Sequence, residues 1–473
     1  MSMSRDEEHA ERQARPESRP ERLLRWQIVI LLAGAALCYG SRKPWMPLPL
    51  LAWSLLSVVP VLLHRAEGRR ASWSAYLPAF LFAVYTAISL LNPSHALALD
   101  GSRKPLEEYL WWLPTTIDPE RTILRNAPWL AALLQGGSLL AMRRSRQAQT
   151  KLLEWIVGVC LGLSLLGALV WSTGAKDMLW SLKVPGGQFF ATFIYKNHWV
   201  AFALPVACAS LGLAFSLWDR GAATQRERNR RLWFFSAATL ILATFPLPVS
   251  RSGTVMGALI LLLAAAGIFR RLLRRSKGEA QKRLRVWLAA GAGAFVLVVV
   301  SGVVWLNWPS IEEGWRRSEN EYTATMERDE WNPRVYSARD TMRMAADKPW
   351  FGWGGGSFFP VFPLYQGNYG RDPKTGVIVA KFEDAHCDWA QVLAEYGCVG
   401  LTLLLVPAVL CLVAVWRNGG TRGRWLFLGA VMILIYALAE FPFQNPVVLV
   451  QWAVLVACVA QEERVKKVRP QWH

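Results

Sequence analysis

Apolar runs of membrane-spanning length recur along the whole chain. A helix needs about 20 apolar residues to cross a hydrocarbon core. The 473-residue sequence contains twelve candidate runs, at about residues 26–40, 45–63, 73–91, 127–142, 152–171, 198–218, 232–250, 253–269, 286–306, 391–416, 425–441 and 446–460. The first and fourth runs are short, which leaves a count of eleven open. We therefore expect an all-α, polytopic membrane protein with about 12 transmembrane helices and a large, partly helical exterior loop.

The net charge of +19 would be typical of a nucleic-acid-binding protein if the chain were soluble. Here the basic residues instead occupy alternate connections between the apolar runs, as they do in cytoplasmic loops of membrane proteins. The basic clusters are Arg65 to Arg70, Arg143 to Lys151, Arg220 to Arg231, Arg270 to Arg285, Arg417 to Arg424 and Arg464 to Arg469. This alternation predicts that both termini are cytoplasmic, that membrane lipids surround the chain and that nucleic acid is not a partner.

The same alternation divides the chain into five segments. Residues 1–25 are charged and lack the apolar core of a signal peptide, so we expect a disordered cytoplasmic tail. Residues 26–306 would carry transmembrane helices 1 to 9, and residues 391–460 would carry helices 10 to 12. Residues 307–390 form the large exterior loop, and residues 461–473 form a second cytoplasmic tail.

The large exterior loop has the composition of a folded segment. Its charges nearly balance and its aromatic residues are frequent. Asn332 followed by Pro333 is a helix-start signal, and small and apolar residues then repeat at helical spacing as far as Pro349. We expect an amphipathic helix at about 333–347 in the membrane interface. It carries Arg334, Arg339 and Arg343, which would reach phosphates or form a solvated cationic face.

Three exterior sites combine cations, amides and imidazoles. Ser250-Arg251-Ser252-Gly253 lies in a short hairpin between two apolar runs, and Lys196-Asn197-His198 precedes another run. His386 lies where the large loop meets the tenth span. A guanidinium at the membrane border is costly without an anionic partner, although Arg251 could instead snorkel to lipid headgroups. Arginine also suits a diphosphate, because its planar fork makes paired hydrogen bonds.

A metal site is not expected at His386. Asp384, His386 and Asp388 alternate, but such short spacing rarely converges on one ion. The spacing of His386 to the glycines that follow it is more informative about function. His386, Cys387, nine further residues and then Gly397-x-x-Gly400 follow one another after the large loop.

This pattern resembles the signature of the O-antigen ligase and O-antigen polymerase superfamily of bacterial membrane glycosyltransferases. The resemblance extends to Arg334, to the run Pro349 to Gly354, to Ser357-Phe358, to Ser250 to Gly253 and to Lys196-Asn197-His198. It covers roughly residues 186–400. Two positions depart from the family: Cys387 replaces an amide or hydroxyl residue, and Lys196 replaces an arginine and loses its bidentate fork.

The resemblance implies an enzyme of the bacterial cell inner membrane whose active site and large loop face the periplasm. Such an enzyme moves a glycan from an undecaprenyl-diphosphate carrier to a hydroxyl of lipid A-core, of another glycan or of a protein. His386 would be the catalytic base, and the transfer would invert the anomeric centre without a metal or cofactor. The diphosphate would contact Arg251, Lys196, Arg339 and Arg334, and other substrate contacts would come from Asn197, His198, Ser250 and Asp388.

Several alternatives stay open. An O-antigen or exopolysaccharide polymerase and a protein O-oligosaccharyltransferase would share these motifs. A transporter or flippase of lipid-linked glycan belongs to another class, and it would be expected to carry its ionisable residues near the membrane midplane. A sensor or scaffold would need only the folded loop. The enzyme hypothesis depends on one expectation, that His386 and Arg251 share an extracytoplasmic pocket.

Overall fold

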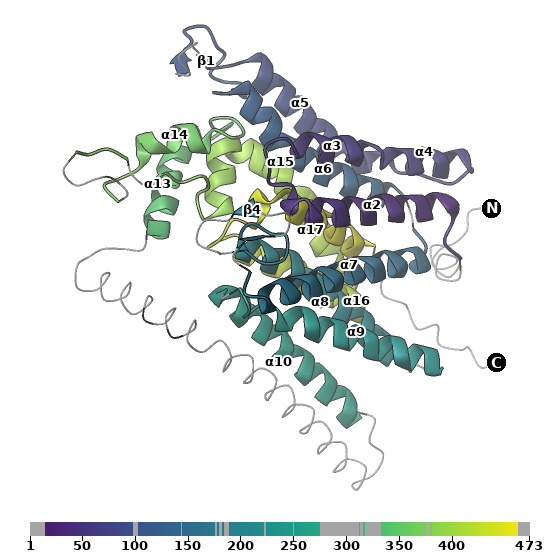
Figure 1. The fold of residues 1–473 in the computed structure, drawn as a ribbon. Helices are drawn as coiled ribbons and strands as arrows, with labels where there is room; N and C mark the ends of the chain where they lie inside the picture. The colour runs from purple at the N-terminus through teal and green to yellow at the C-terminus, as the bar shows by residue number, and fades with distance from the viewer. Residues whose placement is uncertain are drawn as a thin grey trace. The chain divides into compact units, whose positions relative to one another are not determined.

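The computed structural model describes residues 15–461, apart from 98–102, 143, 176, 179–181, 184–188, 222–223, 249, 275–311, 313–315, 317–332, 370, 372–374 and 379–380. The described part is mostly helical (Figure 1). Its named strands form two short antiparallel hairpins, β1 (His95–Leu97) with β2 (Arg103–Pro105) and β3 (Asp177–Met178) with β4 (Leu182–Lys183). The expected all-α class is confirmed. The predicted span at 286–306 lies outside the described residues.

Two compact units divide the chain, and each is described by itself. The first comprises Met1–Ile156 and Asn332–His473, and the second comprises Val157–Trp331. The helices of the first unit are α2 (Arg19–Leu37), η1 (Tyr39–Ser41), α3 (Pro47–Leu55), α4 (Val58–Ala66), η2 (Trp73–Tyr76), α5 (Leu77–Leu91), α6 (Pro119–Ala141), α13 (Pro333–Asp347), α14 (Phe358–Tyr365), α15 (Asp388–Asn418), α16 (Thr421–Tyr436), η5 (Pro442–Gln444) and α17 (Pro446–Ala460). Helix α7 (Arg146–Ser172) continues into the second unit, which also contains α8 (Lys196–Asp219), α9 (Gln225–Ala243) and α10 (Arg251–Arg274).

Six helical segments within the described ranges are long and apolar enough to cross a membrane. They are Pro47–Ala66, Trp73–Leu91, Arg146–Ser172, Lys196–Asp219, Arg251–Leu273 and Asp388–Arg417. The other predicted runs in these ranges coincide with α2, α6, α9, α16 and α17, which fall short of those limits of length or hydropathy. The chain is therefore a polytopic membrane protein, and its total of about twelve spans stays a prediction.

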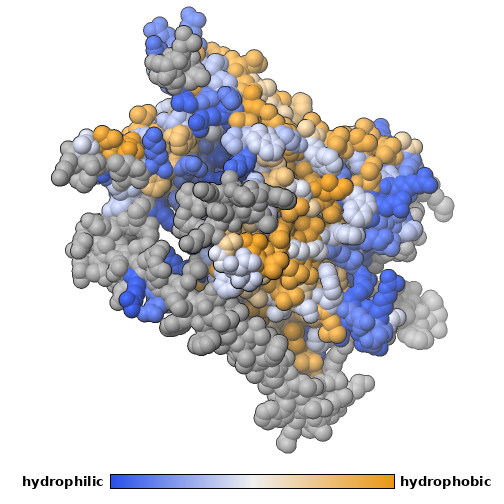
Figure 2. All heavy atoms as spheres, viewed as in Figure 1, coloured by the Kyte–Doolittle hydropathy of each residue, from blue (hydrophilic) through white to orange (hydrophobic). Residues whose placement is uncertain are grey.

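Apolar side chains cover the outward surface of α3, α4 and α5 (Figure 2). Large hydrophobic residues there are exposed, among them Leu55, Leu62, Leu77 and Phe80. A soluble protein rarely exposes so continuous an apolar surface, whereas lipid tails solvate it at little cost. This surface agrees with the membrane assignment.

The core of the first unit lies around α17, which is buried along almost its whole length. It packs against α6, α15 and α16, and α6 in turn packs against α3 and α5. At one end of α17 the Phe443 ring lies between Trp129 of α6, at 6.0 Å, and Trp452 of α17, at 5.0 Å. This aromatic contact fixes the segment between α16 and α17, which lies beside the candidate site.

Helix α2 begins earlier than the sequence interpretation placed it. Residues 19–25, assigned to a disordered tail, form its first turns. A capping box explains the start, because Ser18 N–H donates to Glu21 Oε2 at 2.7 Å and Glu21 N–H donates to Ser18 Oγ at 3.4 Å. The Arg25 guanidinium is also paired, at 2.8 Å, with the buried carboxylate of Glu17. Residues 1–14 of the proposed tail lie outside the described part.

The second unit has α8 at its centre, packed against α9 and α10. Trp199 Nε1–H donates to Thr244 Oγ1 at 3.0 Å, and Ser210 Oγ–H donates to the Phe234 carbonyl at 2.8 Å. Gly253 of α10 lies so close to Val200 of α8 that a Cβ atom would contact the valine side chain at 2.5 Å. Small residues allow membrane helices to approach closely in this way.

Candidate active site

Helix α15 is interrupted at the first glycine of the Gly-x-x-Gly motif. Gly397 has φ 63° and ψ −170°, so the backbone leaves the helical path for one residue. The two amides that follow are satisfied by the large loop: Cys398 N–H donates to the Pro349 carbonyl at 2.8 Å and Val399 N–H donates to the Trp350 carbonyl at 3.0 Å. A broken membrane helix must satisfy its freed backbone groups within the protein. The motif therefore docks the loop onto α15.

The loop returns the same kind of contact on the other side of the break. Trp353 N–H donates to the Ala394 carbonyl at 2.9 Å, and Gly354 N–H donates to the Glu395 carbonyl at 2.9 Å. Gly352 and Gly354 both have positive φ. A Cβ atom on Gly352 would lie 2.5 Å from the Glu395 carbonyl carbon. The glycine-rich run is thus a close-packing segment.

His386 lies two residues before α15. Its backbone conformation is strained, and its side chain packs against a neighbouring ring. Its φ is 53°, an uncommon value for a residue with a side chain. The preceding residue is anchored, because Ala385 N–H donates to Gln391 Oε1 at 2.9 Å. The imidazole packs edge-on against Phe441, with ring centroids 4.8 Å apart. Its Nδ1 atom is buried and finds no hydrogen-bond partner among the described residues.

The electrostatic surroundings keep this imidazole neutral. Burial, and then the positive charge of Arg334, lower the pKa of His386 to about 4. At neutral pH the side chain is unprotonated, so its ring holds a nitrogen lone pair that can accept a proton. A buried acceptor with a shifted pKa and no internal partner is a candidate catalytic group.

Arg334 and Arg339 both lie on α13, which packs against α15. Arg334 Nη1 donates to Glu440 Oε1 at 2.8 Å and remains about half exposed, at 47%. Arg339 is exposed. Ser337, between them, donates its hydroxyl to the Ala385 carbonyl at 3.4 Å. The helix is therefore tethered next to His386, and Arg334 adds positive charge there.

Asp388 has a structural contact that its position in sequence did not indicate. It is fully buried, and its carboxylate accepts hydrogen bonds from Phe443 N–H at 2.7 Å and from Gln444 Nε2 at 2.6 Å. Its own N–H donates to the Ala437 carbonyl at 3.0 Å. Asp388 thus holds the segment that carries Phe441 against His386. The substrate contact predicted for it stays a prediction.

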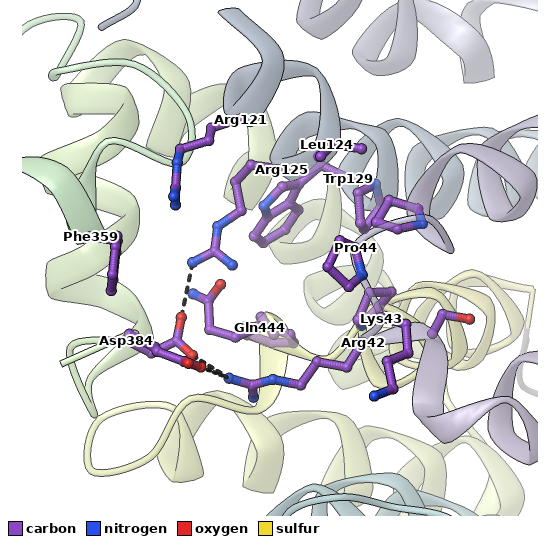
Figure 3. A pocket seen from close by; sticks show the side chains of 16 residues that line it. Arg42, Lys43, Pro44, Arg121, Leu124, Arg125, Trp129, Phe359, Asp384 and Gln444 are labelled. Carbon is purple, nitrogen blue, oxygen red and sulfur yellow. Dashed lines mark hydrogen bonds and ion pairs between the residues drawn. The ribbon is translucent and has the colours of Figure 1, made fainter. Parts of the chain in front are cut away.

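A cavity of about 370 Å³ adjoins this region and was missed by the sequence analysis (Figure 3). Its charged lining residues are Arg42, Lys43, Arg121, Arg125, Glu383 and Asp384. Asp384 joins two of the cations, since Arg42 Nη2 donates to it at 2.7 Å and Arg125 Nη2 donates to it at 3.2 Å. Arg125 also pairs with the buried carboxylate of Glu395 at 3.3 Å.

One signal in the sequence could have pointed to this cavity. Arg42 and Lys43 follow the first apolar run, in a connection that the predicted topology places outside. Basic residues are depleted from short exterior loops, so a pair of them there needs a reason. Their acidic partners were not predictable, because Asp384 lies 342 residues from Arg42 along the chain.

In the second unit, two of the predicted motifs come together. Ser250 Oγ–H donates to Asn197 Oδ1 at 2.8 Å, and Asn197 Nδ2 donates to the Tyr195 hydroxyl at 2.9 Å. Lys196 and Arg251 are the first residues of α8 and α10. Helix N-termini favour anions, so both cations lie at positions where a phosphate would be stabilised. His198 is buried, with its ring 5.2 Å from that of Tyr195.

Comparison with known families decides the assignment. Residues 236–405 match the family model described as O-antigen ligase. Over these residues, about a third of the chain, the sequence is similar to O-antigen ligases. The resemblance predicted from the motifs is therefore confirmed. No curated protein matches the sequence.

The matched range contains most of the predicted site. Ser250, Arg251, Arg334, Arg339, His386 and Asp388 lie inside the matched range. Lys196, Asn197 and His198 precede it, as do Arg42, Lys43, Arg121 and Arg125 of the cavity. The likeness to O-antigen ligases supports an enzyme. The roles of the individual residues, and the meeting of His386 with Arg251, stay predictions.

Proposed function

We propose that this chain is an inverting glycosyltransferase of the bacterial inner membrane. It would transfer a glycan from an undecaprenyl-diphosphate carrier to an acceptor hydroxyl at its periplasmic face, without a metal or cofactor. Lipid A-core is the acceptor that the ligase assignment favours. The observation that carries the proposal is the neutral, buried imidazole of His386, whose Nδ1 has no partner in the described part of the chain.

The proposed reaction needs one proton acceptor and one stabilised leaving group. The acceptor oxygen attacks the anomeric carbon while its proton passes to the His386 imidazole. The bond from the anomeric carbon to the diphosphate oxygen breaks, and its electron pair leaves with the diphosphate. Attack from the opposite face inverts the anomeric centre. A positioned general base typically accelerates such a step by about 10²- to 10⁴-fold.

The leaving diphosphate gains negative charge, which nearby cations would stabilise. We propose Arg251 and Lys196 for this role because each begins a helix in the second unit, where the helix dipole also favours an anion. Ser250 and Asn197, which hydrogen-bond each other at 2.8 Å, would fix these two helix starts. Arg334 and Arg339 are the proposed contributors from α13.

A transfer assay in detergent separates the enzyme from a flippase. Purified protein is mixed with lipid-linked glycan and acceptor in micelles, where there are no compartments to cross. A joined product is the expected result, whereas a protein that only moves lipid-linked glycan between leaflets would give none.

The diphosphate role is tested in the same assay with two substitutions at one position. We expect Arg251→Ala to reduce transfer by about 100-fold and Arg251→Lys to reduce it less, because lysine keeps the charge but loses the paired hydrogen bonds. The control is Arg226→Ala, which removes an exposed arginine of α9 and should leave the rate unchanged. Equal rates in wild type, Arg251→Ala and Arg251→Lys would exclude the role.

A further inference from the structure

The cavity beside His386 is assembled from four connections that are distant in sequence. Its lining residues come from the turn after α2, from the first turns of α6, from the large loop before α15, including Phe359 of α14, and from the segment between α16 and α17. Under the predicted alternation of spans, all four connections lie on the exterior side. Its volume of about 370 Å³ falls within the roughly 300–1,000 Å³ of small-ligand pockets. The cavity is therefore large enough for a sugar unit.

The lining combines cations with flat apolar faces. The lining holds four cationic side chains, Arg42, Lys43, Arg121 and Arg125, and two carboxylates, Glu383 and Asp384. Arg42 and Arg125 point toward Asp384 (Figure 3). Trp129, Phe359 and Phe443 supply aromatic surface, which suits the C–H faces of a pyranose ring.

The cations differ in how far their charges are already matched. Arg125 is matched, since it lies between Asp384 and Glu395. The ammonium of Lys43 lies 5.6 Å from the Tyr39 ring centre, and no carboxylate of the described residues pairs with it. Arg121 is 42% exposed, with one ion pair of 3.3 Å to Asp118. Lys43 and Arg121 can therefore turn toward a bound anion without leaving a buried carboxylate unpaired.

The cavity adjoins the proposed base through two contacts. The Phe441 ring packs against His386, and the Arg42 guanidinium lies 5.6 Å from the centre of the same Phe441 ring. Asp384, which holds Arg42 and Arg125, is two residues from His386 in the chain. The molecule that gives its hydroxyl proton to His386 would therefore extend into this cavity.

We propose that the cavity binds an anionic group, a phosphate or a carboxylate, on the acceptor saccharide. This inference rests on the proposed function only where it names the bound saccharide as the acceptor. In that function the base contacts the acceptor, whereas the donor diphosphate is assigned to Arg251 and Lys196. Recognition would come from charge-assisted hydrogen bonds of Lys43 and Arg121, with Arg42 and Arg125 held rigidly by Asp384.

A binding experiment tests the cavity without any catalysis. Glucose 6-phosphate, glucuronate and glucose are titrated onto the purified full-length protein, with binding followed by saturation-transfer NMR. We expect both anionic sugars to bind wild type, and the double variant Lys43→Gln/Arg121→Gln to bind them at least about tenfold more weakly. The control Lys104→Gln/Arg22→Gln removes two exposed cations outside the cavity and should bind like wild type. Unchanged binding in the Lys43/Arg121 variant, or equal losses in both double variants, would overturn the proposal.

A transfer experiment then identifies the source of the anion. The acceptor is used intact and after enzymatic removal of its phosphates. The double variant should raise the acceptor KM about tenfold for the intact acceptor only, with kcat and the donor KM unchanged. A rise in the donor KM instead would assign the cavity to the donor and overturn the proposal. If wild type transfers nothing yet binds glucose 6-phosphate through Lys43 and Arg121, the transferase function fails while the anion site stands.

Discussion

At the scale of single residues, the chemistry of the candidate site depends on how burial changes ordinary side chains. His386 is one imidazole among six histidines, and its sequence position predicts only that it borders a membrane helix. The structure adds the positive φ, the edge contact with Phe441 and the nearby Arg334. Burial and the positive charge of Arg334 lower the pKa of His386, and no local pattern in the sequence contains these tertiary features.

The pH dependence of transfer follows from that shifted pKa. The neutral imidazole is the active form, so activity should be lost when His386 becomes protonated as the pH falls. Because the pKa is lowered to about 4, the acid limb of kcat/KM should lie near pH 4 and not near the usual value of about 6.5. Arg334→Gln removes a charge that opposes protonation and should move the limb to higher pH. A limb near pH 6.5 in wild type, or one that Arg334→Gln does not move, would contradict this account, provided activity recovers on return to pH 7.

At the scale of elements, the apolar runs predict where helices lie, and they do so because lipid exposure demands continuous apolar sequence. The helix-start signal at Asn332 and Pro333 predicted a helix over residues 333–347, and α13 spans these residues. The break in α15 was not predictable in this way. Gly397 stands within an apolar stretch that reads as one helix, and its positive φ is stabilised by the loop residues 349–354, which pack against it only in the folded chain.

Gly397→Ala tests whether the break is essential. A Cβ atom there would collide with the backbone of Trp350 and Phe351, and alanine also disfavours positive φ by about 1–2 kcal/mol. We expect a loss of about 2 kcal/mol or more, seen as a lower Tm in detergent and faster proteolysis of the large loop. Gly158→Ala in α7 is the matched control, because among the described residues no heavy atom outside its own stretch of helix lies within 4 Å of the place that its Cβ atom would take. Similar Tm values for both variants would exclude the docking role.

A substitution at Cys387 should raise the stability of the protein, whereas Gly397→Ala should lower it. It is the N-cap residue of α15, and its side chain makes no capping hydrogen bond. The family signature has an amide or hydroxyl residue here, which are the side chains that cap helices best. We expect Cys387→Ser to stabilise the protein by about 0.5–2 kcal/mol, measured as a higher Tm, with transfer activity retained. The alanine variant should show no such gain, and equal Tm values for Ser and Ala would show that this position is not a functional cap.

At the scale of the whole molecule, the sequence predicts the class of protein and its family more completely than it predicts the site. Membrane insertion and the order of the motifs are properties of the chain itself. The cavity is different, because Arg42, Arg125 and Asp384 come from three distant segments and converge only after folding. These partners could not be predicted because they lie far apart in the sequence, and the predicted exterior position of Arg42 and Lys43 was the available signal.

The central claim is that His386 is the base of a glycosyl transfer, and a single-turnover rate measures this most directly. Purified wild type, His386→Ala and His386→Gln are mixed with lipid-linked glycan and acceptor, alongside His95→Gln, which alters a histidine of the β1 hairpin. We expect both His386 variants to transfer at least about 100-fold more slowly while keeping the wild-type Tm, and His95→Gln to match wild type. Transfer at the wild-type rate by His386→Ala would contradict the account.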